Sequence, residues 1–256
     1  MTQEPATPDE AARETGADGA GDPAAEPASM QDASRDEGRQ YALPLVIRVE
    51  RADPPARTDA LEAAAQAVLR YLTDPRVAEP AGEWAAATRA WEDARIRKVV
   101  RRARGAAWER AAALDGISVT RGSALVRVFP PVPVDDWPPD LARLQVSGTD
   151  FGDPEPPGDP AVGIPVLWLN PGLPMTAGKA MAQAGHAAQL AWWALPSLAR
   201  AQWRDDGFAL TVRTARPARW AELLASGLPV VTDGGFTEVA PGSATVVAEH
   251  PALRPR

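Results

Sequence analysis

Hydrophobic residues in the second half of the chain recur in segments of two different lengths. Short runs rich in Val, Ile and Leu have the length of strands and cover residues 165–169, 208–213, 230–231 and 244–248. Longer segments rich in Ala, Leu and Trp have the length of helices and cover residues 176–194, 198–204 and 218–226. This alternation predicts an α/β fold in which a mixed sheet is flanked by helices on both faces.

The first half of the chain repeats this order of strands and helices. Four blocks of similar sequence follow one another in the same order: 43–49 with 164–170, 63–66 with 180–183, 100–108 with 212–220, and 121–128 with 241–248. A chance similarity between Ala- and Arg-rich segments is the alternative, but it does not explain the shared order and spacing. The sequence therefore predicts a tandem duplicated fold.

Composition divides the chain into four regions. Residues 1–40 hold three Arg and ten acidic residues, which accounts for the whole net charge of −7, and they contain few large apolar side chains. We expect a disordered acidic tail there, then a domain over 41–146, a Pro- and Gly-rich linker over 147–162, and a second domain over 163–256. The chain after the tail is neutral overall. The negative net charge of the whole chain therefore does not exclude a polyanionic partner for the folded part.

Several classes of protein are disfavoured by composition. The chain has no cysteine and only two histidines, so disulfides are excluded and zinc sites are disfavoured. We expect no metal and no cofactor, and any catalysis must use oxygen, amide and lysine groups. The N-terminus lacks a signal-peptide pattern, and no run of about 18 uncharged apolar residues could span a bilayer. We therefore expect a cytoplasmic protein without a membrane contact.

Lys179 is the first candidate for chemistry. The chain contains 25 Arg but only two Lys, Lys98 and Lys179, so a lysine is an unusual choice of cation here. If Thr176 is the N-cap of its helix, Lys179 is the third helical residue, where the dipole disfavours a cation by roughly 0.3–1 kcal/mol. This placement favours a site that receives an anion, and a surface lysine is the alternative interpretation.

Further polar residues follow at spacings that favour a shared site. Gln183 lies four residues after Lys179 and therefore on the same helix face. Asp233 precedes two glycines of a tight turn, and Thr237 and Thr245 follow it in the last loop and strand. His186 and Ser243 are candidates for binding a substrate, with a packed histidine and a turn hydroxyl as the alternatives.

At these residues the second half resembles the type 2 peptidyl-tRNA hydrolase family. Residues 178–187 fit its Gly-Lys-x-x-x-Gln-x-x-His-Ala helix start, and residues 233–245 fit its Asp-x-Gly-x-Thr-x-x-x-Pro-Gly-[Ser/Thr]-x-Thr stretch. The resemblance spans residues 163–252. It implies a compact α/β fold, a peptidyl-tRNA substrate whose ester bond is hydrolysed, and no metal. It also implies functional roles for Lys179, Gln183, Asp233, Thr237 and Thr245.

Two positions of the second half depart from the family pattern. Phe236 and Glu238 stand where the family usually has Arg and Gln on either side of the loop threonine. The loss of a cation and the gain of an anion predict weaker contact with RNA phosphate.

The first half departs much further from the family pattern. Glu62 stands at the lysine position, four residues before Gln66, and about nine residues are missing between Gly116 and Gly122. We predict a degenerate half that pairs with the second half as an internal pseudo-dimer and binds the substrate. Its candidates for contact with the tRNA backbone are Arg101, Arg102 and Arg104, although a solvated, acid-paired face is the alternative.

Two functional hypotheses follow. In the first, Asp233 positions or deprotonates a water that attacks the ester carbonyl, and Lys179 stabilises the oxyanion. In the second, the chain is a noncatalytic tRNA-binding or protein-interaction module of the same fold. Phe236 and Glu238 favour the module, and the five intact family positions favour the enzyme.

Overall fold

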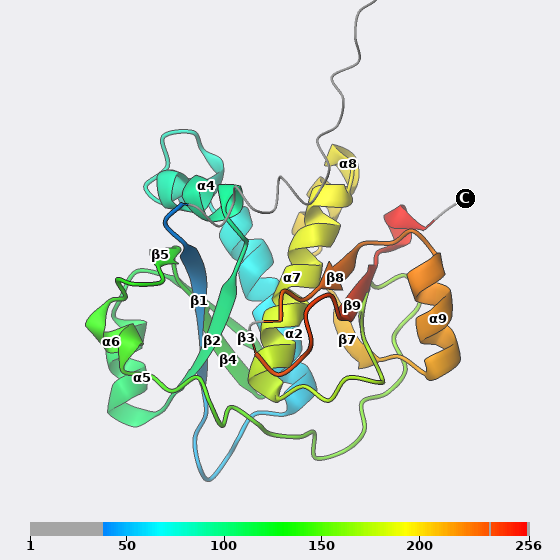
Figure 1. The fold of residues 1–256 in the computed structure, drawn as a ribbon, viewed down its shortest axis with the longest axis horizontal. Coiled ribbons are helices and arrows are strands. Elements are labelled where there is room, and N and C mark those ends of the chain that lie inside the picture. The colour runs from blue at the N-terminus through cyan, green and yellow to red at the C-terminus, as the bar shows by residue number, and fades with distance from the viewer. Residues whose placement is uncertain (1–37, 236, 255–256) are drawn as a thin grey trace, which may run out of the picture.

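The computed structural model describes residues 38–235 and 237–254, and it has a mixed α/β fold (Figure 1). The predictions for the acidic tail up to residue 37 and for Phe236 lie outside the described residues. The first half contains β1 (Tyr41–Arg48), α2 (Arg57–Leu72), α3 (Pro75–Ala78), α4 (Ala85–Asp93), β2 (Lys98–Ala103), α5 (Gly105–Ala112), β3 (Ile117–Arg121), β4 (Ala124–Val128), β5 (Val132–Pro133) and α6 (Pro139–Ala142). The second half contains β6 (Val166–Leu169), α7 (Ala177–Ala194), α8 (Ser197–Asp205), β7 (Thr211–Thr214), α9 (Pro217–Ala225), β8 (Val230–Thr232), β9 (Ala244–Glu249) and a 3-10 turn, η1 (Pro251–Leu253).

The two halves form separate mixed sheets with the same topology. The first sheet has the order β2-β1-β4-β3, with β5 added to β1, and the second has the order β7-β6-β9-β8. In each sheet the first strand runs parallel to one neighbour and antiparallel to the other. The predicted α/β class with mixed sheets is confirmed, and the shared topology supports the predicted duplication.

Strand register corrects one block of the proposed alignment. Leu45 lies opposite Val100 and Val128, whereas Leu167 lies opposite Val212 and Ala248. Leu45 therefore corresponds to Leu167, one residue away from the alignment of 43–49 with 164–170. The two prolines that this alignment pairs are not at equivalent positions, because Pro44 lies within β1 and Pro165 precedes β6.

Helices α2 and α7 lie between the two sheets and pack against each other (Figure 1). Their alanines permit this close approach, and a Cβ at Gly185 of α7 would lie 3.0 Å from Cγ2 of Val68 on α2. The most extensive contact of α7 is with α2. The halves thus share one core rather than meeting across a polar surface.

Helices also cover the outer face of each sheet (Figure 1). Strand β1 illustrates the reason: Leu45 and Ile47 face the shared core, whereas Val46 packs with Trp108 of α5 on the other face. On the second sheet, Val247 packs with Trp220 of α9. Successive side chains of a strand point to opposite faces of the sheet. Because both faces of β1 are buried, the buried positions of the strand are continuously apolar.

One predicted strand starts later than expected. Residues 208–213 were predicted as a strand, but β7 begins at Thr211. Phe208 has a φ of 60° and its N–H donates to the carbonyl of Trp203 at 2.8 Å, so it belongs to the turn after α8 rather than to a strand. Its ring packs edge-on against Trp203, with the centroids 5.9 Å apart. Burial of this aromatic ring outweighs the unfavourable backbone conformation.

The predicted linker, residues 147–162, contains no helix or strand but is held in place by both halves. The Asp153 carboxylate accepts hydrogen bonds from N and Oγ1 of Thr58 at 2.7 and 2.8 Å, at the start of α2. The carbonyl of Gly158 accepts from Nε of Arg213 at 2.7 Å. The segment therefore crosses between the halves along a defined path.

Candidate active site

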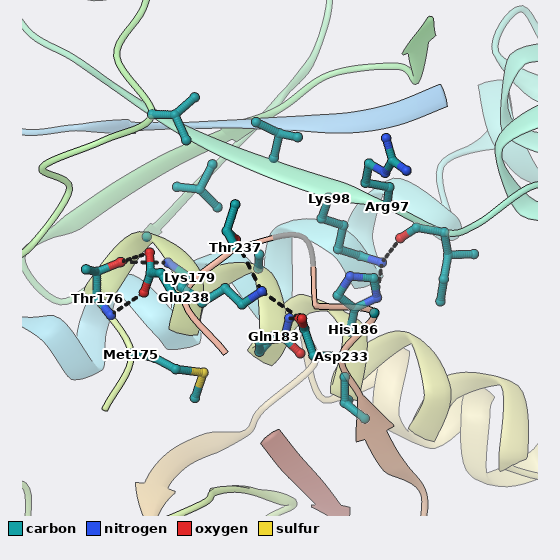
Figure 2. Close-up of a pocket in the computed structure, with 18 of the residues that line it drawn as sticks. Arg97, Lys98, Met175, Thr176, Lys179, Gln183, His186, Asp233, Thr237 and Glu238 are labelled. Carbon is teal, nitrogen blue, oxygen red and sulfur yellow. Dashed lines mark hydrogen bonds and ion pairs between the residues drawn. The ribbon is translucent and has the colours of Figure 1, made fainter. Parts of the chain in front are cut away.

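Five predicted site residues meet at the N-terminal part of α7 (Figure 2). Lys179 and Gln183 lie one turn apart on α7, Asp233 directly follows β8, Thr237 lies in the next loop, and Thr245 is on β9. Figure 2 shows Lys179 extended toward Asp233 and Thr237. Segments that are more than 50 residues apart in sequence thus converge because β8, β9 and α7 pack side by side.

A continuous set of hydrogen bonds joins these side chains. Nζ of Lys179 lies 2.6 Å from Oδ2 of Asp233 and 3.4 Å from Oγ1 of Thr237. Nε2 of Gln183 donates to the same Oδ2 at 2.7 Å, and Oε1 of Gln183 accepts from Oγ1 of Thr245 at 2.6 Å. Thr245 therefore fixes the orientation of the Gln183 amide, and that amide fixes the carboxylate.

The ion pair at the centre of this network is shielded from solvent. The Lys179 and Asp233 side chains are 9% and 7% exposed. The second carboxylate oxygen of Asp233 accepts from the N–H of Gly235 at 2.7 Å, and the positive φ of Gly235, 76°, makes this turn possible. This arrangement holds the carboxylate in one orientation, because both of its oxygens are bound to the chain.

The start of α7 does not offer free N–H groups to an anion, contrary to our expectation. Thr176 is the N-cap, as predicted, and its Oγ1 accepts from the N–H of Lys179 at 3.3 Å. The N–H of Ala177 donates to Asp150, and that of Gly178 donates to the carbonyl of Thr149. Each of these donors has an acceptor within the chain, so Lys179 is the remaining cationic contact for a substrate at this helix end.

Glu238 has a local role that the sequence did not reveal. Its carboxylate accepts from N and Oγ1 of Thr176 at 2.9 and 2.8 Å. A carboxylate at a helix N-terminus is stabilised by the dipole, so this departure from the family pattern serves the fold of the site. Its charge is therefore partly offset at the position where it was expected to repel RNA.

His186 faces the same region and contacts the second lysine of the chain (Figure 2). Nδ1 of His186 lies 3.4 Å from Nζ of Lys98, and that Nζ also donates to Oε1 of Gln189 at 2.5 Å and to the carbonyl of Ile96 at 3.1 Å. Burial, together with the charges of Lys98 and Lys179, lowers the pKa of His186 well below its ordinary value. The imidazole is therefore neutral at pH 7.

The remaining predicted site residues lie elsewhere. Ser243 is outside the lining of the cleft, and its carbonyl accepts from the N–H of Asp233 at 2.9 Å. Arg101 donates to the carbonyl of Leu144 at 2.6 Å, Arg102 donates to Oε1 of Gln145 at 2.6 Å, and Arg104 is exposed at the start of α5. The structure does not bring these arginines to the residues around Lys179.

A cleft of about 1500 Å³ contains the site, and both halves of the chain line it. The second half contributes α7 from Thr176 to Trp193 and the loop after β8. The first half contributes Glu92 and residues 94–100, and residues 146–148 and Asp150 also line it. Sequence reasoning missed this first-half wall. Its one available signal was the rarity of lysine, which singled out Lys98 as much as Lys179.

The described residues contain neither a metal-binding cluster nor a membrane-spanning helix. No group of three or more His, Cys, Asp or Glu side chains is placed to hold a metal ion in residues 38–235 and 237–254. No helix in the same ranges is long and apolar enough to cross a bilayer.

This geometry defines an α/β domain whose polar site consists of an ammonium, a carboxylate, an amide and two hydroxyls at the edge of a mixed sheet. Comparison with known families gives a more specific result. Residues 165–255 match the family model described as peptidyl-tRNA hydrolase PTH2, which confirms the resemblance for the second half of the chain. At the level of the family, the match supports a hydrolase of peptidyl-tRNA. No curated protein sequence matches the chain significantly.

Proposed function

We propose that this protein hydrolyses the ester bond of peptidyl-tRNA and releases the peptide and free tRNA. The observation that carries the proposal is the buried network of Lys179, Asp233, Gln183 and Thr245, which lies within the range that matches the family. Ester hydrolysis needs a positioned water and stabilisation of an oxyanion, and this network offers a carboxylate and an ammonium at adjacent points.

Asp233 and Thr237 are the groups that orient the attacking water in this proposal. Oδ2 of Asp233 is bound by Lys179 and Gln183, and Oδ1 accepts a hydrogen bond from the N–H of Gly235. A carboxylate oxygen has two acceptor directions, so Oδ1 has room for a water. Oγ1 of Thr237 lies 3.4 Å from Nζ of Lys179, and this hydroxyl can hold that water against the ester carbonyl.

Lys179 is the group that stabilises the developing negative charge. Its ammonium has three N–H donors, of which one binds Asp233 and one binds Thr237. The third can donate to the carbonyl oxygen of the ester. An ammonium that is already held in place by Asp233 needs little reorganisation in the transition state, which is the condition for effective electrostatic catalysis.

The first half has a structural and binding role in this proposal. The halves share their strand order, and α2 packs against α7, as expected for an internal pseudo-dimer that arose by duplication. The arginines Arg102 and Arg104 remain candidates for contact with the tRNA backbone. A substrate made by ribosomes would place the protein in the cytoplasm.

The test is hydrolysis of N-acetyl-aminoacyl-tRNA by the purified chain, measured as release of the labelled N-acetyl amino acid from the tRNA. We expect Lys179→Ala and Asp233→Asn each to lower kcat/KM by roughly 10²–10³, the usual effect of removing one group that stabilises an oxyanion. Asp205→Asn, at an exposed position of α8, is the matched control and should keep full activity. Circular dichroism and thermal unfolding show whether each variant folds.

The noncatalytic module is the second candidate, and this experiment separates it from the enzyme. Wild-type protein that binds tRNA but releases no acyl group under any condition tested would establish the module. Release that persists unchanged in folded Lys179→Ala and Asp233→Asn protein would remove the proposed mechanism.

A further inference from the structure

The cleft is much longer than the reacting group requires. It follows α7 from Lys179 to Trp193, a span of 14 residues, or about 21 Å at 1.5 Å per residue. The ion pair of Lys179 and Asp233 lies near one end. If the ester is bound at this ion pair, the rest of the cleft holds one of the two parts that the ester joins, the peptide or the tRNA.

The lining of the cleft does not suit a polyanion. The charged side chains among its described lining residues are balanced, with four acidic and four basic: Glu92, Asp150, Asp233, Glu238, Arg95, Arg97, Lys98 and Lys179. Sites for RNA backbone are strongly cationic, because phosphates are bound by displacing their counterions. A neutral arm of the substrate fits this cleft better.

Apolar side chains are exposed along the cleft. Val146 and Trp193 are 49% and 41% exposed, and both line it, together with Ile96 and Leu190. Exposed apolar groups gathered in one cleft indicate an apolar ligand. They lie on both walls, since Val146 and Ile96 belong to the first-half side and Leu190 and Trp193 belong to α7.

Strand β2 presents backbone groups to the same cleft. It is the edge strand of its sheet, and Leu43 N–H donates to the carbonyl of Arg97 while Val49 N–H donates to that of Ala103. By the alternation of a parallel ladder, the backbone groups of even-numbered residues point away from β1. Arg102 uses its N–H to bind the carbonyl of Gln145, and Lys98 and Val100, the other two even-numbered residues of β2, line the cleft.

Part of the linker lines the corresponding cleft of the other half. By the strand and helix correspondence, the cleft between α7 and β2 is related to the one between α2 and β7. That smaller cleft, about 390 Å³, is lined by Asp153 and residues 157–160 of the linker. Within this lining, the main-chain carbonyl of Gly158 accepts a hydrogen bond from Nε of Arg213 at 2.7 Å.

We propose that the first half forms the binding site for the peptidyl part of the substrate, which lies extended between β2 and α7 with apolar side chains against Val146, Ile96, Leu190 and Trp193. This inference rests on the proposed function and specifies its substrate class: peptidyl-tRNAs with several apolar residues before the ester. At about 3.3 Å per extended residue, the cleft accommodates about six residues.

The test compares substrates that share one tRNA and one esterified residue. One carries N-acetyl-glycine, one carries an N-acetylated Leu- and Val-rich hexapeptide, and one carries an N-acetylated Gly- and Ser-rich hexapeptide. We expect the apolar hexapeptide to have a kcat/KM at least tenfold above that of N-acetyl-glycine, and the Gly- and Ser-rich one to gain much less. The advantage should grow with peptide length and level off near six residues.

Variants at the exposed apolar positions locate the site. Val146→Asp and Trp193→Ser should lower the ratio of kcat/KM for the apolar hexapeptide over N-acetyl-glycine at least tenfold, without changing affinity for deacylated tRNA. Leu198→Ser is the matched control: it is 73% exposed on α8, outside the lining, and should leave the ratio unchanged.

Three results would overturn the inference. The first is a ratio that is the same in the variants as in the wild type. The second is an equal weakening of all substrates and of deacylated tRNA by both variants, which would place RNA in the cleft. The third is a wild-type dimer in sedimentation that Val146→Asp converts to a monomer, which would make the cleft an interface between two copies.

Failure of the proposed function itself gives a different result. Wild-type protein would then release no acyl group from any of the three substrates. In that case, binding of a fluorescein-labelled Leu- and Val-rich hexapeptide amide decides the inference. Binding by the wild type that Val146→Asp weakens at least tenfold supports it, and no binding by the wild type overturns it.

Discussion

Glu62 on α2 occupies the position that Lys179 occupies on α7, and the two side chains carry opposite charges. Each lies four residues before the aligned glutamine, Gln66 or Gln183. Lys179 binds Asp233 at 2.6 Å, whereas Nε of Arg121 binds Oε2 of Glu62 at 2.9 Å.

The partners of Glu62 and Lys179 lie at similar positions in the two sheets. Arg121 lies two residues after Val119, which pairs with Val126, and Asp233 lies two residues after Val231, which pairs with Val246, with a register shift between Val231 and Thr232. Both halves therefore join a helix to the end of the third strand by an ion pair, with reversed charges. The first half lacks the ammonium and carboxylate of the site but has a contact that links the same two kinds of element.

A charge exchange in the second half should reproduce the first. Lys179→Glu alone leaves two carboxylates in a buried place, and we expect the free energy of unfolding to fall by about 3–5 kcal/mol. Adding Asp233→Arg restores an ion pair and should recover much of that loss. Hydrolysis should remain absent in the double variant, because the ammonium beside the ester is gone. Urea unfolding and acyl release measure the two effects, and a double variant as unstable as Lys179→Glu would contradict the assigned correspondence.

Glu62 should also hold the two halves together. Its side chain is 4% exposed, and beyond Arg121 it binds Nη1 of Arg213 at 3.2 Å and accepts from the N–H of Val212 at 3.2 Å. Removal of the carboxylate leaves these second-half donors without their acceptor. We expect Glu62→Ala to lower the free energy of unfolding by about 3 kcal/mol.

Glu222→Ala is the control for this measurement. It removes a carboxylate that is 66% exposed and pairs with Arg219, so its effect should stay within about 1 kcal/mol. Equal effects of Glu62→Ala and Glu222→Ala in urea unfolding would show that Glu62 does not link the halves.

Stability should fall when the pH drops below the ordinary histidine pKa of about 6.5. Burial lowers the pKa of His250 to about 4, so the folded chain keeps this ring neutral while the unfolded chain protonates it. Its Nδ1 accepts from the N–H of Ala252, and its ring packs against Trp203 with the centroids 5.0 Å apart. His186 contributes with the same sign, because its pKa is also lowered.

The measurement is urea unfolding between pH 7 and pH 4. Each histidine should lower the free energy of unfolding by up to about 1.4 kcal/mol per pH unit below 6.5. In His250→Gln the free energy of unfolding should fall less steeply with decreasing pH than in the wild type, by the contribution of one histidine, up to about 1.4 kcal/mol per pH unit. Superimposable pH dependences of the two proteins would show that His250 does not titrate as described.

The sequence alone determined the features that depend on local spacing. The strand and helix lengths predicted the α/β class, the N-cap assumed at Thr176 is the one observed, and the four-residue interval placed Gln183 on the face of Lys179. The two family motifs, in order, indicated that Asp233, Thr237 and Thr245 would join them. The inferences on α7 succeeded because helix periodicity is fixed by the backbone, whereas the expected meeting of Asp233, Thr237 and Thr245 with Lys179 came from the family resemblance.

Only the tertiary structure decided which distant groups share one environment. Glu238 was interpreted as a charge that repels RNA, yet it caps α7 through Thr176. Arg101 was assigned to tRNA and instead binds the carbonyl of Leu144, whereas Lys98 of the first half lies beside His186 of the second. Such contacts depend on how α2, α7 and the two sheets pack, and no local periodicity encodes that packing, because it follows from the fit of many side chains at once.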